Sequence, residues 1–176
     1  MQDGARLQAA IEILDEVRLA SATGGAAADT LVARYFASRR YAGSKDRAAI
    51  RALVFDAIRF SAERPLSGRA LLLGLAEQCR PELLPLFNGG THAPAAVTAD
   101  EPRSSPSLYP RWLHDELLAR FGDRLEPELQ ALLERAPLDL RVNPMRAPIA
   151  EVAAALGAQP IAGLPNGLRL AAPVAL

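Results

Sequence analysis

Over its first 135 residues the chain repeats apolar positions at the three- and four-residue spacing of helices, interrupted by short stretches rich in Gly, Pro and Ser. This spacing puts the apolar side chains on one face, which predicts amphipathic helices packed on one another. In the first helix the apolar stripe consists of Leu7, Ala10, Ile11, Leu14 and Val17. The predicted helices cover residues 5–20, 29–43, 44–59, 71–79, 81–87, 110–121 and 125–135.

The ends of the second and third helices can be predicted from their polar residues. We expect Asp29 or Thr30 to cap the second helix, which ends at Gly43, and Ser44 to cap the third. Asp46 places a negative charge in the first turn of the third helix, where the helix dipole favours it. The inward stripe of that helix consists of Ile50, Leu53, Val54, Ala57 and Ile58.

The fourth helix is apolar around most of its circumference, so we expect it to be the most buried element. Cys79 lies on its stripe and is expected to be a small core residue. After Pro110, the helical spacing predicts an inward face that ends at Gly122. That face consists of Trp112, Leu113, Leu117 and Phe121.

The pattern changes at two places. Residues 88–108 are rich in Gly, Pro, Ser and Thr without periodicity, which predicts a long loop that is functional or mobile. From Leu138 to Val142 apolar and polar residues alternate, as in a half-buried strand. A helix over 149–156 and a strand over 168–170 follow, which is the start of an α/β unit. So small a sheet would be poorly covered, so we expect the chain to be a fragment.

The predicted fold class is therefore mainly α, a helical bundle followed by the start of a small α/β domain. We place the helical domain at residues 1–135, with the loop 88–108 inside it, and the α/β segment at 136–176.

Composition fits one globular domain, or one domain and part of another, because half of the 176 residues are hydrophobic and the formal net charge is zero. Zero net charge means that no global field attracts nucleic acid or membranes. No stretch approaches the roughly 18 uncharged apolar residues of a membrane span, and no secretory signal opens the chain, so we expect a cytoplasmic protein without membrane contact. The single cysteine excludes an intramolecular disulfide and a Cys-based zinc site.

No complete catalytic constellation is present in the sequence. The dinucleotide-binding glycine motif, the P-loop, HExxH and GxSxG are all missing. His92 and His114 have no cysteine or carboxylate at metal-ligand spacing, and we interpret both as surface residues. We therefore assign no catalytic, cofactor-binding or metal-binding residue to this chain.

Charge is uneven between residues 34 and 51, where six cations face one acid, Asp46. Such an excess can follow a phosphate backbone, which makes these cations the candidate RNA-binding residues. The alternative is a solvated helix face whose arginines pair with Asp46 or Asp56. Of the aromatic residues nearby, Tyr35 is expected in the core. The six cations are Arg34, Arg39, Arg40, Lys45, Arg47 and Arg51.

Three stretches in this order resemble one family. Residues 41–50 and 53–59 are similar to the NusB-like helical domain that opens the Sun/Fmu (RsmB-like) RNA cytosine-C5 methyltransferases. Residues 107–113 with Phe121 and Gly122 resemble the helix that joins that domain to the next, and residues 136–144 resemble the first strand of the small pre-catalytic α/β domain.

The resemblance implies a NusB-like bundle and, for the parent protein, methyl transfer from S-adenosylmethionine to cytosine C5 in ribosomal RNA, with small-subunit RNA as the partner. In that family a cysteine thiolate of a C-terminal Rossmann-like domain performs the attack. That domain and its Pro-Cys motif lie outside these residues, so no catalytic or cofactor residue is carried over. Two hypotheses follow: an RNA-engaging N-terminal portion that docks to the missing catalytic domain, or a protein-interaction module that forms a homodimer without a catalytic role.

Overall fold

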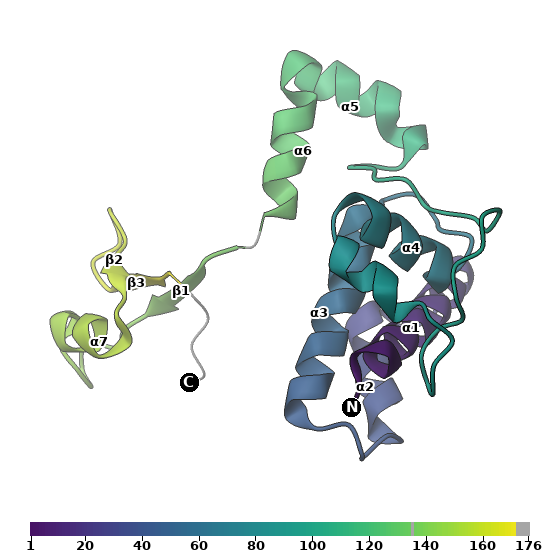
Figure 1. Cartoon of the computed structure of the whole chain (residues 1–176). Coiled ribbons are helices and arrows are strands. Elements are labelled where there is room, and N and C mark those ends of the chain that lie inside the picture. Colours follow the sequence, from purple (N-terminus) through teal and green to yellow (C-terminus); the bar gives the residue numbers. More distant parts are fainter. Residues whose placement is uncertain (135, 172–176) are drawn as a thin grey trace. The chain divides into compact units, whose positions relative to one another are not determined.

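The computed structural model describes residues 1–134 and 136–171 (Figure 1). Its contacts divide the chain into two units, Met1–Leu132 and Leu133–Leu176, and each is described by itself. Arg135, where the predicted last helix of the bundle ends, lies outside the described residues. The placement of the domain boundary between 135 and 136 stays a prediction.

The first unit is helical, as predicted. Four α-helices are followed by a 3₁₀ helix and a long loop, and then by a 3₁₀ turn that leads into a pair of shorter helices, which a further 3₁₀ turn joins. The elements are α1 (Asp3–Thr23), α2 (Ala28–Ala37), α3 (Ser44–Phe60), α4 (Gly68–Gln78), η1 (Pro81–Leu86), η2 (Arg111–Leu113), α5 (His114–Phe121), η3 (Gly122–Arg124) and α6 (Leu125–Leu133).

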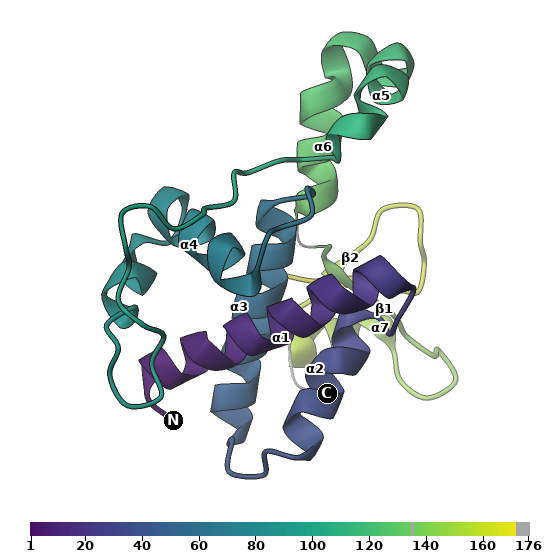
Figure 2. The same ribbon diagram turned by 90° about the vertical axis from the view of Figure 1, so that its right-hand side faces the viewer.

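Helix α1 is the centre of the bundle, because it packs against α2, α3, α4 and η1. Figure 2 shows it running across α3. The predicted apolar stripes form the core, in which Leu7, Ile50 and Leu72 are fully buried. Since the burial of one such side chain contributes about 1.5–3 kcal/mol, these stripes supply the main stabilisation of the bundle.

Helix α4 is the most buried helix, as predicted, since every residue from Ala70 to Ala76 is buried. Its start is fixed twice: the Gly68 N–H donates to Asp15 Oδ1 at 2.8 Å, and Ser67 Oγ accepts from the Ala70 N–H at 3.0 Å. A side chain at Gly68 would collide with the backbone of α1, so glycine is required for this close approach.

The loop 88–108 is irregular, as predicted, but it is packed onto α4. The Ser104 N–H donates to the Ala70 carbonyl at 2.9 Å, and a Cβ at Gly74 would collide with the Ser104 carbonyl. Arg69 also pairs with Glu101 at 2.6 Å. The loop therefore packs directly against α4.

Two predicted helix ends are wrong. Helix α2 ends at Ala37, well before Gly43, because Ala42 is buried and the chain leaves the helix to carry it inward. Neither Asp29 nor Thr30 caps α2: the N-cap is Ala27, and the Asp29 carboxylate accepts from the neighbouring Thr30 N–H at 2.8 Å.

Ser44 does not cap α3, because it is already the first helical residue and Gly43 occupies the N-cap. Asp46 lies in the first turn, as predicted, and its Oδ2 accepts from the Gly43 N–H at 3.3 Å. The carboxylate three residues into the helix thus supplies the side-chain half of a capping box, and the glycine has no side chain to complete it.

Two residues predicted to be inside are exposed. Cys79 follows the last helical residue of α4, and its backbone (φ −130°) turns the side chain away from the apolar stripe. Trp112 is 78 % exposed because it lies in the 3₁₀ turn η2, which has three residues per turn and shifts the helical phase. Leu113, Leu117 and Phe121 are half-buried.

The second unit contains the strands and the helix predicted from alternation and periodicity: β1 (Leu138–Arg141), α7 (Ile149–Leu156) and β3 (Gly167–Leu170). A two-residue strand, β2 (Gln159–Pro160), was missed because so short a segment shows no alternation. The sheet order is β1-β3-β2 with antiparallel neighbours. Strand β3 thus lies between β1 and β2, so β1-α7-β2 is the split β-α-β arrangement of ferredoxin-like folds. The predicted fold class is confirmed.

Candidate nucleic-acid interface

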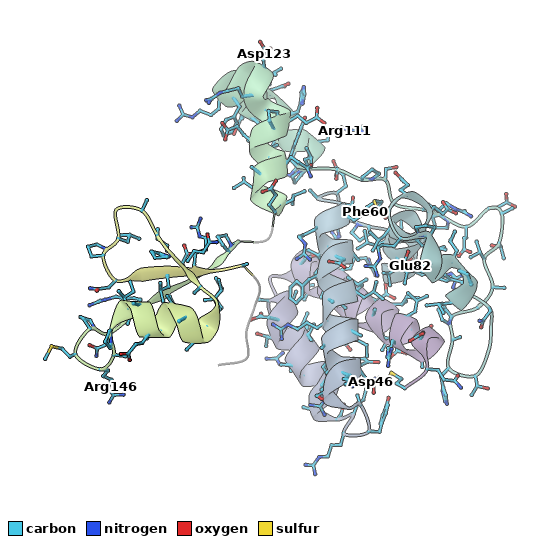
Figure 3. All side chains as sticks on the ribbon, turned by 60° about the vertical axis from the view of Figure 1, so that its left-hand side comes forward. Asp46, Phe60, Glu82, Arg111, Asp123 and Arg146 are labelled. Carbon is cyan, nitrogen blue, oxygen red and sulfur yellow. The ribbon has the colours of Figure 1, made fainter. Side chains whose placement is uncertain are left out.

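The six candidate cations lie on α2, on the turn 38–43 and on the first half of α3. Figure 3 shows Asp46 at this end of α3 and Phe60 at the other. Tyr35 and Phe36 of α2 and Ala42 of the turn are buried in one core with residues of α1 and α3. The structure gives the six cations different environments.

Arg39 is held in place by contacts with Tyr35 and Glu12. Its guanidinium lies 3.6 Å from the centre of the Tyr35 ring, and its Nη1 donates to the Tyr35 carbonyl at 3.3 Å. Its Nη2 lies 3.6 Å from Glu12 Oε2 of α1. Arg39 therefore joins α2 to α1 and has part of its charge compensated.

Arg47 fixes the turn between the two helices. Its Nε donates to the Ala42 carbonyl at 2.8 Å, and its guanidinium lies 5.5 Å from the centre of the Phe36 ring. No carboxylate among the described residues pairs with it. The positive charge thus remains uncompensated although the side chain has a structural role.

Asp46 does not neutralise the cluster, because it pairs with Arg6 of α1. Nε and Nη2 of Arg6 each lie 2.8 Å from Asp46 Oδ1. The hydrogen bond from Arg6 holds the pKa of Asp46 below its ordinary value. Asp56 likewise pairs with Arg59 and Arg80, so the expected pairing of cluster arginines with Asp46 or Asp56 is wrong.

The other four candidate cations, Arg34, Arg40, Lys45 and Arg51, are exposed. None of them forms an ion pair with the part of the chain that the structure describes. Arg51 lies 5.5 Å from the ring centre of Phe55, one turn further along α3. These four side chains can reach an external anion without breaking an ion pair with the described residues.

A groove of about 930 Å³ lies beside this cation cluster, between α1, the end of α2 and the loop residues Thr91 and His92. Tyr41 lines it and is 74 % exposed. Gln8 and Glu12 of α1 also line it. Gln8 and Glu12 were not predicted as site residues. Their spacing on one helix is visible in the sequence, but the contact of Glu12 with Tyr35 of another helix is not.

The two histidines lie at different grooves. His114 is exposed, and its Nδ1 lies 2.8 Å from the Tyr109 hydroxyl at a second groove of about 860 Å³. His92 is exposed at the first groove. Among residues 1–134 and 136–171, no three His, Cys, Asp or Glu side chains are grouped to hold a metal ion. Nor does any helix in these ranges have the length and apolar character needed to cross a membrane.

Residues 109–176 match the family described as "Methyltr_RsmF/B-like, ferredoxin-like domain". The C-terminal part of the chain is thus similar to a domain of RsmF/B-like methyltransferases. The match covers α5, α6 and the β-α-β-β unit, and it supports the family relationship that residues 107–113 and 136–144 indicated. It does not reach the helices α1–α4, whose NusB-like character stays a prediction. Searches of curated proteins and of solved structures gave no significant match.

The residues described here do not fit a cofactor site for S-adenosylmethionine. Nucleotide-type cofactors bind at the carboxyl ends of parallel strands beside a glycine-rich turn. The sheet of this chain has three strands with antiparallel neighbours, and its first strand leads into residues 142–148, which contain no glycine. We therefore assign no step of methyl transfer to these residues.

Proposed function

We propose that this chain is the RNA-engaging N-terminal portion of an S-adenosylmethionine-dependent ribosomal RNA cytosine-C5 methyltransferase, whose catalytic domain lies outside the chain. The match of residues 109–176 to the RsmF/B-like ferredoxin-like domain supports the methyltransferase context. The observation that carries the RNA contact is a set of exposed cations on α2, the turn 38–43 and α3 that have no carboxylate partner among residues 1–134 and 136–171. Small-subunit RNA follows from the family resemblance alone.

The cluster separates into two groups. Arg34, Arg40, Lys45 and Arg51 are available to phosphates, whereas Arg39 and Arg47 hold the turn between α2 and α3 in place. Phosphate contacts by free cations release counterions, so the logarithm of the binding constant falls linearly with the logarithm of the salt concentration. A binding experiment should therefore change residues of the first group and leave Arg39 and Arg47 in place.

The test is fluorescence anisotropy of the 176-residue chain with a labelled small-subunit ribosomal RNA hairpin, titrated between about 50 and 200 mM salt. The triple variant Arg34→Gln/Arg40→Gln/Lys45→Gln is expected to bind more weakly. Its slope of log K against log salt should be shallower by about 2 to 3, because each phosphate contact contributes about 0.9.

A matched control changes three exposed arginines elsewhere, Arg64→Gln/Arg120→Gln/Arg146→Gln. This variant loses the same charge but keeps the cluster, so its affinity and salt slope should stay near those of the wild type. Equal losses in both triple variants would show that only net charge matters, and equal affinity of the cluster variant and the wild type would remove the cluster from RNA binding.

The alternative is a protein-interaction or dimerisation module without a catalytic role. The observation in its favour is the exposure of large apolar side chains on η2, α5 and α6: Trp112 and Leu132 are each 78 % exposed, and Leu118 is 47 % exposed. Light scattering over a range of protein concentrations, with and without RNA, separates the two functions. Self-association that Trp112→Ser abolishes, without RNA affinity, would favour this alternative.

A further inference from the structure

The groove beside the cation cluster has a polar floor that the fold fixes in place. Glu12 of α1 accepts hydrogen bonds from Gln8 Nε2 at 3.2 Å and from the Tyr35 hydroxyl at 2.7 Å, and Arg39 lies 3.6 Å from it. Each carboxylate oxygen has a second acceptor position, and Gln8 Oε1 receives no hydrogen bond from the described residues. The floor therefore presents acceptors to a ligand that can donate.

One wall of the groove is aromatic. Tyr41 follows Arg39 and Arg40 in the turn between α2 and α3, lines the groove, and is 74 % exposed. A tyrosine in the core would be expected to bury its ring, as Tyr35 does. An exposed ring beside two cations offers a stacking surface with a phosphate-binding group next to it.

Thr91 and His92, which also line the groove, belong to a loop held against α1. A Cβ at Gly4 would come within 2.7 Å of the Ala93 side chain, so the loop lies directly on the first turn of α1. The loop is closed by a hydrogen bond from the Gly89 N–H to the Pro94 carbonyl at 2.8 Å. His92 of this loop has a φ of 65°, an uncommon value for a residue other than glycine. Its side of the loop lines the groove.

We infer that the groove binds one unstacked nucleobase of the RNA, and that this base carries an exocyclic amino group. The base stacks on Tyr41, its amino group donates to Glu12 or to Gln8 Oε1, and the exposed Arg40, the residue before Tyr41, contacts the adjoining phosphate. This inference rests on the proposed RNA contact and names its base-binding element. The volume of about 930 Å³ is within the range of about 300–1,000 Å³ that holds small ligands.

Because Glu12 and Gln8 offer hydrogen-bond acceptors, cytosine and uracil are suitable probes that differ in an edge group. Cytosine presents an N4 amino donor where uracil presents an oxygen acceptor, and glutamate accepts hydrogen bonds from that amino group. Opposite Glu12, the uracil oxygen would face a carboxylate and lose this contact. A good bidentate contact to a base edge is worth about 1–3 kcal/mol, which corresponds to about 5- to 150-fold in affinity.

The experiment measures anisotropy of labelled rC6 and rU6 with the full chain at one low salt concentration. We expect rC6 to bind at least about 5-fold more tightly than rU6. Tyr41→Leu should weaken rC6 binding by about 5-fold or more, the effect of losing one base–aromatic stack, whereas Tyr41→Phe, which keeps the ring, should match the wild type. Glu12→Gln should reduce the preference for rC6 over rU6.

The outcomes separate this inference from the proposed function. Binding that depends on Arg34, Arg40 and Lys45, but is equal for rC6 and rU6 and unchanged by Tyr41→Leu, overturns the base site and leaves RNA contact intact. No binding of either oligonucleotide or of the ribosomal hairpin overturns both. Tyr41 is exposed, so Tyr41→Leu is expected to fold, and its thermal unfolding curve checks this. Loss of a protein partner on Tyr41→Leu, without RNA affinity, also overturns the inference.

Discussion

Arg6 of α1 and Asp46 of α3 form an ion pair across 40 residues of sequence, with the Nε and Nη2 atoms of Arg6 each 2.8 Å from Asp46 Oδ1. The same carboxylate accepts the Gly43 N–H through its other oxygen. One side chain thus caps α3 and ties it to α1. The pair explains why Asp46, the only acid between residues 34 and 51, does not neutralise the cations of the cluster.

Asp46→Asn is expected to destabilise the chain, because the neutral amide loses the attraction to Arg6 while the cap to Gly43 can be kept. The measurement is urea unfolding, in which the midpoint should fall with an unchanged slope. Asp3→Asn is the control, since Asp3 also pairs with Arg6, at 2.6 Å, but from an exposed position. A loss in Asp3→Asn as large as in Asp46→Asn would show that the contact with α3 has no special role.

Stability is expected to fall in acid, in part through two carboxylates of the helical unit, Asp46 and Glu101. The hydrogen bond from Arg6 lowers the pKa of Asp46, and the hydrogen bond from Arg69 lowers the pKa of Glu101. Since both pKa values are lower in the folded state than in the unfolded chain, their contribution is present above about pH 4. It is lost as the pH falls through the folded-state values.

The measurement is the free energy of unfolding in urea at several pH values between 7 and about 3. In Asp46→Asn/Glu101→Gln the decline in acid should be shallower than in the wild type, because neither site can take up a proton. Parallel curves for the two proteins would assign the acid sensitivity to other carboxylates. Asp123→Asn, at an exposed residue for which no ion pair with the described residues is present, is the matched control.

Gly74→Ala tests the packing of the loop 88–108 on α4. Alanine in a helix is favoured over glycine by about 1 kcal/mol, but the new Cβ would overlap the Ser104 carbonyl, a backbone atom that cannot rotate away. We expect the overlap to dominate and to cost about 1–3 kcal/mol in the free energy of unfolding. Urea unfolding measures it, and a gain in stability would show that the loop can leave α4 without loss.

The parts of the fold that were predicted from sequence are those decided by local periodicity. The stripe from Leu7 to Val17 faces the core, and along residues 138–142 the apolar Leu140 and Val142 are less exposed than their polar neighbours, so spacing alone identifies each element. The strand Gln159–Pro160 was beyond this approach, because it is a strand only through its pairing with β3.

The errors lie where tertiary contacts determine the local structure. The burial of Ala42 ends α2 early, and the 3₁₀ turn at Trp112 changes the phase of a helical pattern. For the candidate site, the cation cluster is visible in the sequence. Which of its members are free is not, since Glu12, the partner of Arg39, and Arg6, the partner of Asp46, both come from another helix.

Arg47→Ala and Arg40→Ala each remove one positive charge, but only Arg47→Ala is expected to lower the stability of the fold. Arg47 Nε donates to the Ala42 carbonyl at 2.8 Å, and a hydrogen bond from a charged donor contributes about 1.5–3 kcal/mol. Because Arg47 is only half-buried, we expect Arg47→Ala to lose about 1–2 kcal/mol in the free energy of unfolding, by urea titration. Arg40 is exposed without an ion pair to the described residues, so Arg40→Ala should stay within about 0.5 kcal/mol of the wild type. Similar stability losses in both variants would contradict the division of the cluster into two groups, whereas a loss of RNA affinity in Arg40→Ala at unchanged stability would support it.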